Sequence, residues 1–128
     1  MTLKQFKNYC LKKKGVQETY PFDDSALVMK VVGKMFCLTN VKPLTINSVE
    51  EKAFHHISVK CDPEMGDDLK RNHKDIIPGW HLNKTHWISL LMEGNLKDDM
   101  IKMLIDHSYD LVVSKMTKKD REKLALMT

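Results

Sequence analysis

The sequence predicts an α+β fold in two layers. Three observations lead to this prediction. Helix-like segments stand at the two ends and near the middle of the chain, the segments between them alternate apolar and polar residues, and a glycine turn joins two of these alternating segments. A run of strands followed by helices is typical of an antiparallel α+β sheet and not of a wound parallel sheet.

The first predicted element is a helix over residues 3–14. Thr2 and Gln5 have the spacing of a capping box, and apolar residues recur at helical spacing through Cys10. Three consecutive lysines suit the carboxyl end of a helix, and Gly15 is a suitable residue to end it.

A β-hairpin is predicted next. "ALVMKVV" and "KMFCLTNV" have strand composition and are separated by Gly33. The period of two places Leu27, Met29 and Val31 on one face.

Residues 42–55 form a long connector, in which residues 43–52 could supply a further strand or a long loop. "HHISVKC" then alternates, with Ile57, Val59 and Cys61 on one face and Ser58 and Lys60 on the other.

The second half contains a helix, a strand and more helices. Asp62 is a suitable N-cap and Pro63 a suitable first residue for a helix over residues 63–74. Acidic residues occupy the first half of this segment and basic residues the second half, as the helix dipole favours. "HWISLLMEG" has strand composition. Apolar residues at helical spacing from Met100 onward predict a helix, with a break near Ser108 where that serine would act as a cap. Thr117 would cap a last short helix.

Composition predicts a single domain over residues 1–128. Of the 128 residues, 42% are hydrophobic and 30% charged, and no repeat or composition break marks a linker. No apolar stretch approaches the ~20 residues that cross a bilayer, and the N-terminal residues lack the apolar block of a signal peptide. Three widely spaced cysteines are typical of reduced thiols. We therefore expect a cytoplasmic protein without a membrane partner.

The net charge of +4 comes from the termini. Residues 1–20 contain five lysines and one glutamate, and residues 114–128 contain five basic and two acidic residues. Residues 21–113 contain eleven basic and fourteen acidic residues, a net charge of −3. The overall charge alone therefore does not indicate a nucleic-acid surface.

One stretch stands out by composition: "PGWHLNKTHW", residues 78–87, contains both tryptophans of the chain. Together with "KMF", "SVKCDPE" and "DHSYDLV", it resembles the MmcQ/YjbR-like family over nearly the whole chain. The sequence departs from the usual family pattern in having Trp80 where tyrosine is more common, and in its long connector over residues 42–55.

The resemblance implies a frataxin/CyaY-like fold, which is a small two-layer α/β sandwich with helices on one face of a mostly antiparallel sheet. It also implies membership of a largely uncharacterised bacterial family for which DNA binding through a "double wing" arrangement of the sheet has been suggested. No enzymatic activity is implied.

Six residues are candidates for contact with nucleic acid. Lysine, arginine and histidine can bind phosphate, and asparagine can bind a base edge or the backbone. On this basis we select Lys34, Lys60, Arg71, His81, Asn83 and Lys84. The alternative for the 78–87 stretch is structural: Pro78 and Gly79 form a turn, Trp87 faces the core, and the Asn and His side chains hold the loop by hydrogen bonds.

No metal site, cofactor site or catalytic site is predicted. The six histidines and three cysteines lack CxxC, HxxxH and HExxH spacing, and the isolated glycines form no phosphate-binding loop. The lysine-rich first helix does not match the acidic ridge that iron binding would require.

Three functions remain open at this point. The first is a non-enzymatic, uncharacterised bacterial-type protein that binds DNA through an open sheet face and basic residues. The second is a protein-interaction or regulatory domain that binds a polypeptide partner through the same sheet face and residues 78–87. The third, an enzyme or small-molecule binder, requires a concave pocket on which His81, His86 or Tyr109 converge.

Overall fold

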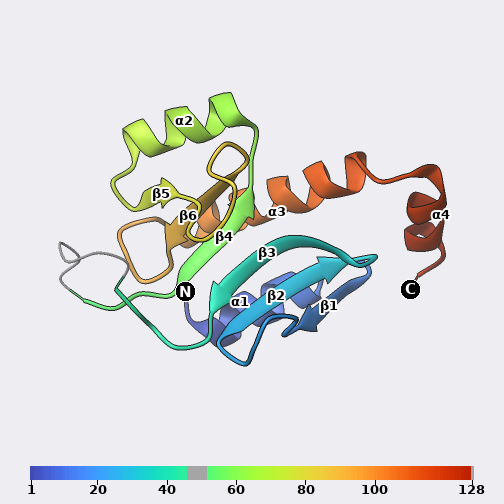
Figure 1. Cartoon of the computed structure of the whole chain (residues 1–128), viewed down its shortest axis with the longest axis horizontal. Helices are drawn as coiled ribbons and strands as arrows, with labels where there is room; N and C mark the ends of the chain where they lie inside the picture. Colours follow the sequence, from blue (N-terminus) through green and yellow to red (C-terminus); the bar gives the residue numbers. More distant parts are fainter. Residues whose placement is uncertain (46–51, 128) are drawn as a thin grey trace.

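A twisted sheet with helices packed beside it forms the molecule, as Figure 1 shows for the computed structural model. The structure describes residues 1–45 and 52–127. Its helices are α1 (Leu3–Leu11), α2 (Pro63–Asn72), α3 (Asp98–Ser114) and α4 (Lys118–Leu126). Its strands are β1 (Val16–Thr19), β2 (Ala26–Val31), β3 (Lys34–Asn40), β4 (His56–Lys60), β5 (Ile76–Pro78) and β6 (Trp87–Leu91).

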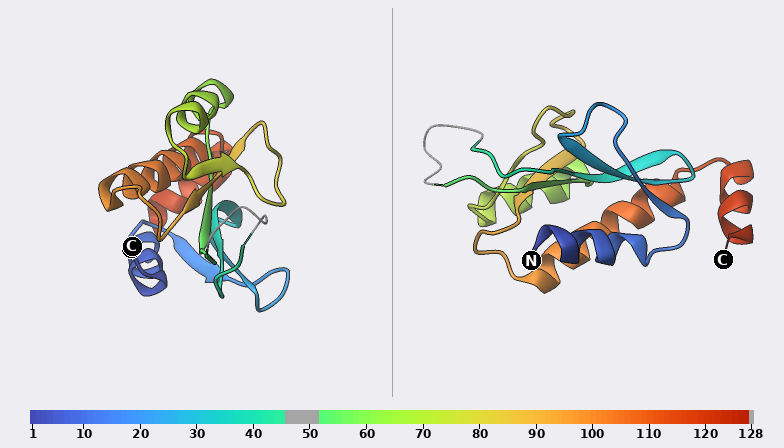
Figure 2. Two further views of the ribbon diagram at one scale, coloured as in Figure 1. Left: turned by 90° about the vertical axis from the view of Figure 1, so that its left-hand side faces the viewer. Right: turned by 90° about the horizontal axis from the view of Figure 1, so that it is seen from below.

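The sheet has the order β1-β2-β3-β4-β6-β5, and every pair of neighbouring strands is antiparallel. Helices α1 and α3 lie against one face of it, as the right-hand view of Figure 2 shows. Helix α2 packs near β5, at one end of the sheet. The predicted α+β fold with an antiparallel sheet is confirmed.

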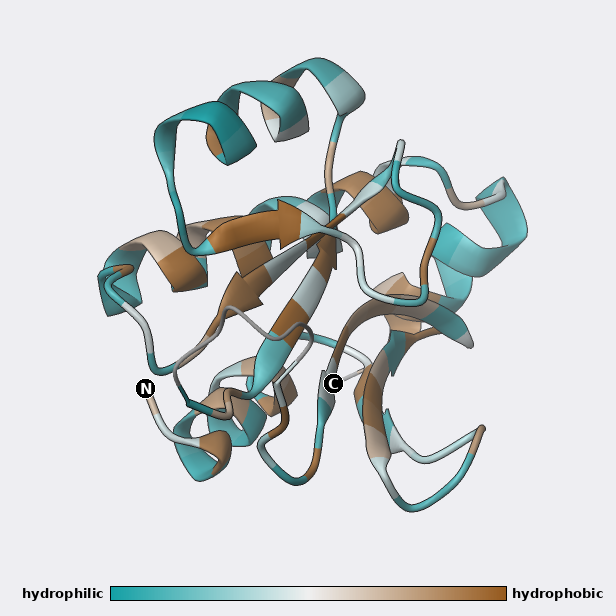
Figure 3. Ribbon diagram, turned by 60° about the vertical axis from the view of Figure 1, so that its left-hand side comes forward, coloured by the Kyte–Doolittle hydropathy of each residue, from teal (hydrophilic) through white to brown (hydrophobic). Residues whose placement is uncertain are grey.

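The core lies between the sheet and these helices. Alternate residues of the central strands face it, including Leu27, Met29, Val31, Ile57 and Val59, none more than 1% exposed. Both predicted alternations are therefore confirmed. Apolar residues concentrate on the strands and on α3, whereas α2 is mostly hydrophilic (Figure 3).

A tight turn and a bulge shape the predicted β2–β3 hairpin. Val32 and Gly33 both have positive φ, 48° and 74°, as a two-residue turn of the mirror-image type requires. Further along, Met29 pairs with Cys37 but Lys30 pairs with Met35, so that Phe36 is the extra residue of a β-bulge. The Phe36 ring packs edge-on against Tyr109 of α3, with ring centroids 5.4 Å apart.

Helix α3 is continuous through Ser108, so the predicted break there is wrong. Ser108 is fully buried, and its hydroxyl donates to the Phe36 carbonyl at 2.5 Å and accepts from the Lys60 amide at 2.9 Å. The serine therefore satisfies backbone groups of β3 and β4 next to the registered pairs of these two strands, Cys37 with Val59 and Leu38 with Ser58. A polar residue in the helix interior was mistaken for a cap because its partners are distant in sequence.

The two earlier helices end sooner than predicted. Helix α1 ends at Leu11 because the chain turns over residues 12–15, and Gly15 takes φ 73°. Helix α4 packs there so closely that a Cβ on Gly15 would lie 2.6 Å from Leu124 Cδ1. Helix α2 ends at Asn72 because His73 is already extended and leads into β5. The capping box of Thr2 and the cap of Thr117 are confirmed.

Two strands were not predicted, β1 and β5. Both are edge strands, with four and three residues, and neither is long enough to display a clear alternation. The predicted strand or loop over residues 43–52 lies within the connector of residues 42–55, which is described only at its ends, where Leu44 and Phe54 form an isolated antiparallel bridge. The middle of that connector, residues 46–51, lies outside the described residues.

Replacing Ser108 tests the link between α3 and the sheet. Ser108→Ala should lower the free energy of unfolding by about 1–3 kcal/mol, because two backbone groups lose a buried partner. Urea denaturation measures this. Ser114→Ala is the matched control on the same helix, since its hydroxyl is exposed and bonds only within the helix, and it should change stability by less than about 0.5 kcal/mol. Equal effects of the two variants would contradict the assigned role.

Tyr9 makes the stability of the fold depend on pH in the alkaline range. Burial, followed by the hydrogen bonds of its hydroxyl to Asp106 at 2.7 and 2.8 Å, raises the pKa of Tyr9 to about 12 from 10.0. Because the folded-state pKa is the higher one, this contribution to stability is complete below about pH 10 and is lost as pH rises toward 12.

Tyr9→Phe should therefore show a shallower loss of stability than the wild type over that pH range. Urea denaturation at stepped pH measures the difference between the two proteins, so that other titrating groups cancel. Parallel stability curves for the two proteins would show that Tyr9 does not carry this linkage.

Candidate functional site

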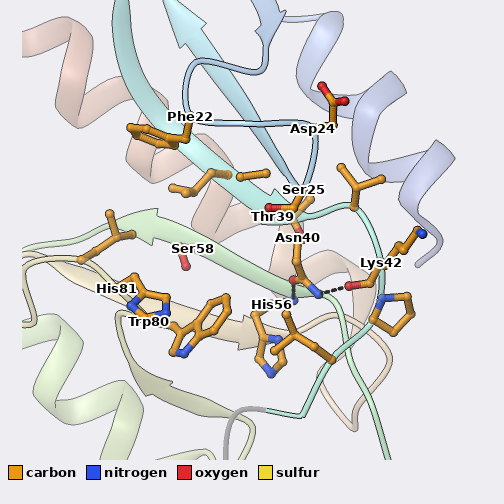
Figure 4. A pocket seen from close by; sticks show the side chains of 16 residues that line it. Phe22, Asp24, Ser25, Thr39, Asn40, Lys42, His56, Ser58, Trp80 and His81 are labelled. Carbon is orange, nitrogen blue, oxygen red and sulfur yellow. Dashed lines mark hydrogen bonds between the residues drawn. The ribbon is translucent and has the colours of Figure 1, made fainter.

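The sheet face opposite α1 and α3 holds a pocket of about 770 Å³. It lies between the loop of residues 20–25 and the loop that begins at Trp80, above strands β3 and β4 (Figure 4). The side chains that define it are those of Phe22, Leu38, His56, Ser58, Trp80 and His81. The surface of the pocket is predominantly apolar.

One wall is formed by aromatic rings in contact with each other. The rings of Trp80 and His81 have centroids 4.3 Å apart, and the His56 ring lies 6.1 Å from that of Trp80 on its other side. His81 has φ 60°, in the left-handed region that residues other than glycine rarely adopt. Such strain costs of order 1 kcal/mol or more and is found disproportionately at functional sites. Here it places the imidazole against the indole.

The opposite wall is Phe22, whose side chain is unusually exposed for its size at 69%. In Figure 4 it lies across the pocket from Trp80 and His81. Its loop is held by Asp23, which accepts hydrogen bonds from the amide and hydroxyl of Ser25; these bonds lower the pKa of the Asp23 carboxyl. The Val41 amide also donates to the Ser25 carbonyl at 2.8 Å, which ties the loop to the end of β3.

The floor contains two hydroxyl groups. Ser58 of β4 and Ser89 of β6 are paired strand residues with their hydroxyl oxygens 2.6 Å apart. Ser89 is completely buried and also accepts from the Trp80 amide at 3.0 Å, whereas Ser58 reaches the pocket. This chain of hydrogen bonds connects the aromatic wall to the floor.

Asn40 fixes the two strands on which the floor is built. Its side-chain amide donates to the carbonyls of Lys42 and Phe54 at 2.6 and 2.9 Å, and its carbonyl accepts from the His56 amide at 2.6 Å. The three bonds join the end of β3 to the start of β4 across the base of the connector. They therefore set the position of His56 in the pocket.

The centre of the pocket carries no permanently charged group among the described side chains. Asp24 and Lys42 line its margin, but Figure 4 shows their charged ends directed away from Trp80 and His81. The titratable groups that remain are the imidazoles of His56 and His81.

The candidate nucleic-acid residues are spread over the molecule. Lys34 pairs across the hairpin with a core residue of β2, so it projects from the helix side of the sheet. Lys60 follows Ser58 by two residues in β4 and so lies on the open face. Arg71 is on α2, where it forms an ion pair with Asp68. Lys34, Lys60 and Arg71 therefore do not share one surface.

The polar side chains of the loop before β6 bond mainly within the loop. The side-chain oxygen of Asn83 accepts from the amides of Thr85 and His86 at 2.8 and 3.2 Å. The Lys84 ammonium donates to the Gly79 carbonyl at 2.8 Å. Among the candidates in this stretch, His81 lines the pocket, the contacts of Asn83 match the structural alternative, and Lys84 bonds to the backbone of the same loop.

Trp87 is buried at 9% exposure, as expected, but it lies outside the core cluster between the sheet and the helices. The period of two places it with Ser89 on the open side of the sheet. There it packs beneath Gly79, where a Cβ would lie 2.7 Å from that of Trp87. The close approach explains the glycine.

Of the three residues expected to converge on a pocket, one does so. His81 lines it; His86 is exposed in the preceding loop, and Tyr109 lies on the helix side, where its hydroxyl donates to the Lys14 carbonyl at 2.7 Å. Sequence reasoning missed Phe22, Leu38 and His56. The alternation of residues 55–61 did place Ser58 outward, and that was the available signal.

Within residues 1–45 and 52–127, no three His, Cys, Asp or Glu side chains gather as a metal site would require. Within those same ranges, no helix has the length and apolar character to span a bilayer.

Comparison with known proteins gives relatives over nearly the full chain. The uncharacterised protein YjbR of Escherichia coli K12 is 31% identical over 124 residues, which are 97% of this chain and 98% of the relative. The uncharacterised protein YbdF of Escherichia coli O157:H7 is 29% identical over 118 residues, 92% of this chain and 89% of the relative.

Two solved structures are also similar. A crystal structure of a Deinococcus radiodurans protein with the domain DUF419 has a TM-score of 0.81 and 34% identity, covering 98% of this chain and 88% of that one. A crystal structure of a Pseudomonas syringae protein has a TM-score of 0.73 and 30% identity, covering 87% of this chain and 98% of that one. The YjbR family profile matches residues 11–111. The chain therefore belongs to the YjbR family.

Proposed function

We propose that this YjbR-family protein is a non-enzymatic binding protein that holds a small organic molecule in the pocket on its open sheet face. The observation that carries the proposal is the pocket itself. Its volume of about 770 Å³ falls within the roughly 300–1,000 Å³ of small-molecule sites. Such sites combine apolar and aromatic walls with a few placed polar groups, and here Trp80, Phe22 and Ser58 supply that combination.

Binding without catalysis agrees with the contacts of the pocket serine. A serine nucleophile needs a neighbouring base, whereas the Ser58 hydroxyl is paired with that of Ser89. Ser89 in turn accepts from a backbone amide. This arrangement favours a structural or recognition role for both hydroxyls.

DNA binding, predicted from the sequence, is less well supported by the charges. A DNA surface needs several cations that can contact phosphates together. Arg71 is paired with Asp68, Lys84 bonds to Gly79, and Lys34 projects from the helix side. Binding of a polypeptide side chain in the pocket is the other sequence-based alternative, and both remain predictions.

Titration of ¹⁵N-labelled protein with a library of small organic molecules tests the proposal by NMR. Binding molecules should shift the amide signals of Leu38, Ser58, Trp80 and His81 in a saturable manner. Trp80→Ala should weaken these binders by about tenfold, the loss expected for removal of a principal ring contact. The control is Tyr20→Ala, an exposed aromatic beside the same loop that does not line the pocket, and it should leave affinity within about twofold.

The same spectra decide between the alternatives. In one outcome, no library member shifts the amide signals of the pocket, whereas a short DNA duplex shifts the signals of Lys60 and Arg71 and these shifts decrease as salt is added. The small-molecule proposal would then be wrong, and the DNA prediction would be supported. If the pocket responds only to peptides with apolar side chains, the polypeptide alternative is supported instead.

A further inference from the structure

We infer that the ligand of this pocket is an uncharged, flat aromatic molecule that inserts between Phe22 and the Trp80–His81 pair and makes a hydrogen bond to Ser58. This inference rests on the proposed function and specifies the chemical class of its ligand. It follows from the shape of the walls, the absence of charge at the centre, and one buried hydroxyl.

The walls favour a flat aromatic group over an aliphatic one. Phe22 stands on one side of the pocket and the rings of Trp80 and His81 on the other (Figure 4). Aromatic rings attract each other in offset and edge-on arrangements beyond the effect of area burial alone. Trp80 and His81 are already tilted by 47° with centroids 4.3 Å apart, so together they present an angled aromatic surface.

Phe22 exposes apolar surface that a bound ligand could cover. A phenylalanine that is 69% exposed leaves a large apolar surface in water, and its neighbours in the loop do not cover it. The loop around it is nevertheless ordered by Asp23, Ser25 and Val41. The ordered loop therefore holds the exposed Phe22 ring opposite the aromatic wall, and a flat ring could bind between the two.

The lack of a permanently charged group at the centre of the pocket, among the described side chains, argues for a neutral ligand. An ionised group that enters an apolar site without a partner loses its hydration at high cost. The permanent charges at the margin, Asp24 and Lys42, point away from the aromatic wall. A ligand seated against Trp80 and His81 would therefore find no fixed charge to pair with among the described side chains that line the pocket.

Ser58 supplies the polar contact. A hydroxyl has one donor and two acceptor positions, and the bond to Ser89 uses one of them. Ser58 is 4% exposed and opens toward the pocket, so a polar group of the ligand can bond to it away from bulk water. An amide or carbonyl on the ring would meet this requirement.

A matched set of probes tests the inference: indole-3-carboxamide, indole-3-carboxylate, tryptamine and cyclohexanecarboxamide. Each is titrated into the full chain, with isothermal calorimetry for affinity and NMR amide shifts for location. Indole-3-carboxamide should bind at the pocket at least about fivefold more tightly than the other three, consistent with the gain from ring stacking and the cost of a buried charge.

Two variants identify the contacts. Phe22→Ala should weaken indole-3-carboxamide by about three- to tenfold and leave cyclohexanecarboxamide nearly unchanged, whereas Tyr20→Ala should affect neither. Ser58→Ala should weaken indole-3-carboxamide more than unsubstituted indole. Phe22 is exposed, so its variant tests binding of the flat ring even if the buried Ser58→Ala variant does not fold.

The outcomes separate the two proposals. Equal or tighter pocket binding of cyclohexanecarboxamide, or of either charged indole, would overturn the neutral aromatic class and leave the small-molecule function standing. Tighter binding of the carboxylate at lower pH would assign an anionic ligand to the two histidines. If none of these probes and no member of the diverse library reaches the pocket, the proposed function itself fails, and this inference with it.

Discussion

Helices α1 and α3 bury one face of the six-stranded sheet, and this one-sided packing determines where the other features of the molecule lie. Every second residue of β2 and β4 must be apolar to fill the space beneath the helices, as Met29 and Val59 do. The residues between them then project from the opposite face. Within residues 1–45 and 52–127 no helix covers that face, and two loops lie over it with the pocket between them (Figure 2).

Two buried polar side chains reinforce the contact between β3 and β4, one from α3 and one from β3 itself. Ser108 reaches from α3 to β3 and β4, and Asn40 closes the junction of the same two strands farther along. Buried polar groups are stabilising when each is fully bonded. In this chain they also position residues of the pocket, because His56 and Ser58 lie on β4, the strand that Ser108 and Asn40 both contact.

Features set by local geometry were predictable from the sequence, and features set by distant contacts were not. The alternation in residues 55–61 placed Ser58 opposite Ile57 because a strand has a period of two wherever it stands. The capping role of Thr2 is likewise settled within one helical turn. The pocket instead depends on β4 lying between β3 and β6, and on Phe22, which stands in a loop without periodicity. Lys84 is open to two interpretations from the sequence, because the loop that brings its ammonium to the Gly79 carbonyl has no periodic pattern.

The ladder between β3 and β4 is short, with registered pairs at Cys37 and Val59 and at Leu38 and Ser58 in the described chain. The sheet is therefore two three-stranded halves joined by a narrow seam, which Ser108 and Asn40 reinforce. The pocket straddles this seam, because Phe22 and Leu38 belong to one half and Ser58 and Trp80 to the other. A ligand in the pocket would contact both halves of the sheet. Binding would therefore restrict motion of one half relative to the other, and its effect would extend through the whole sheet and not only over one surface.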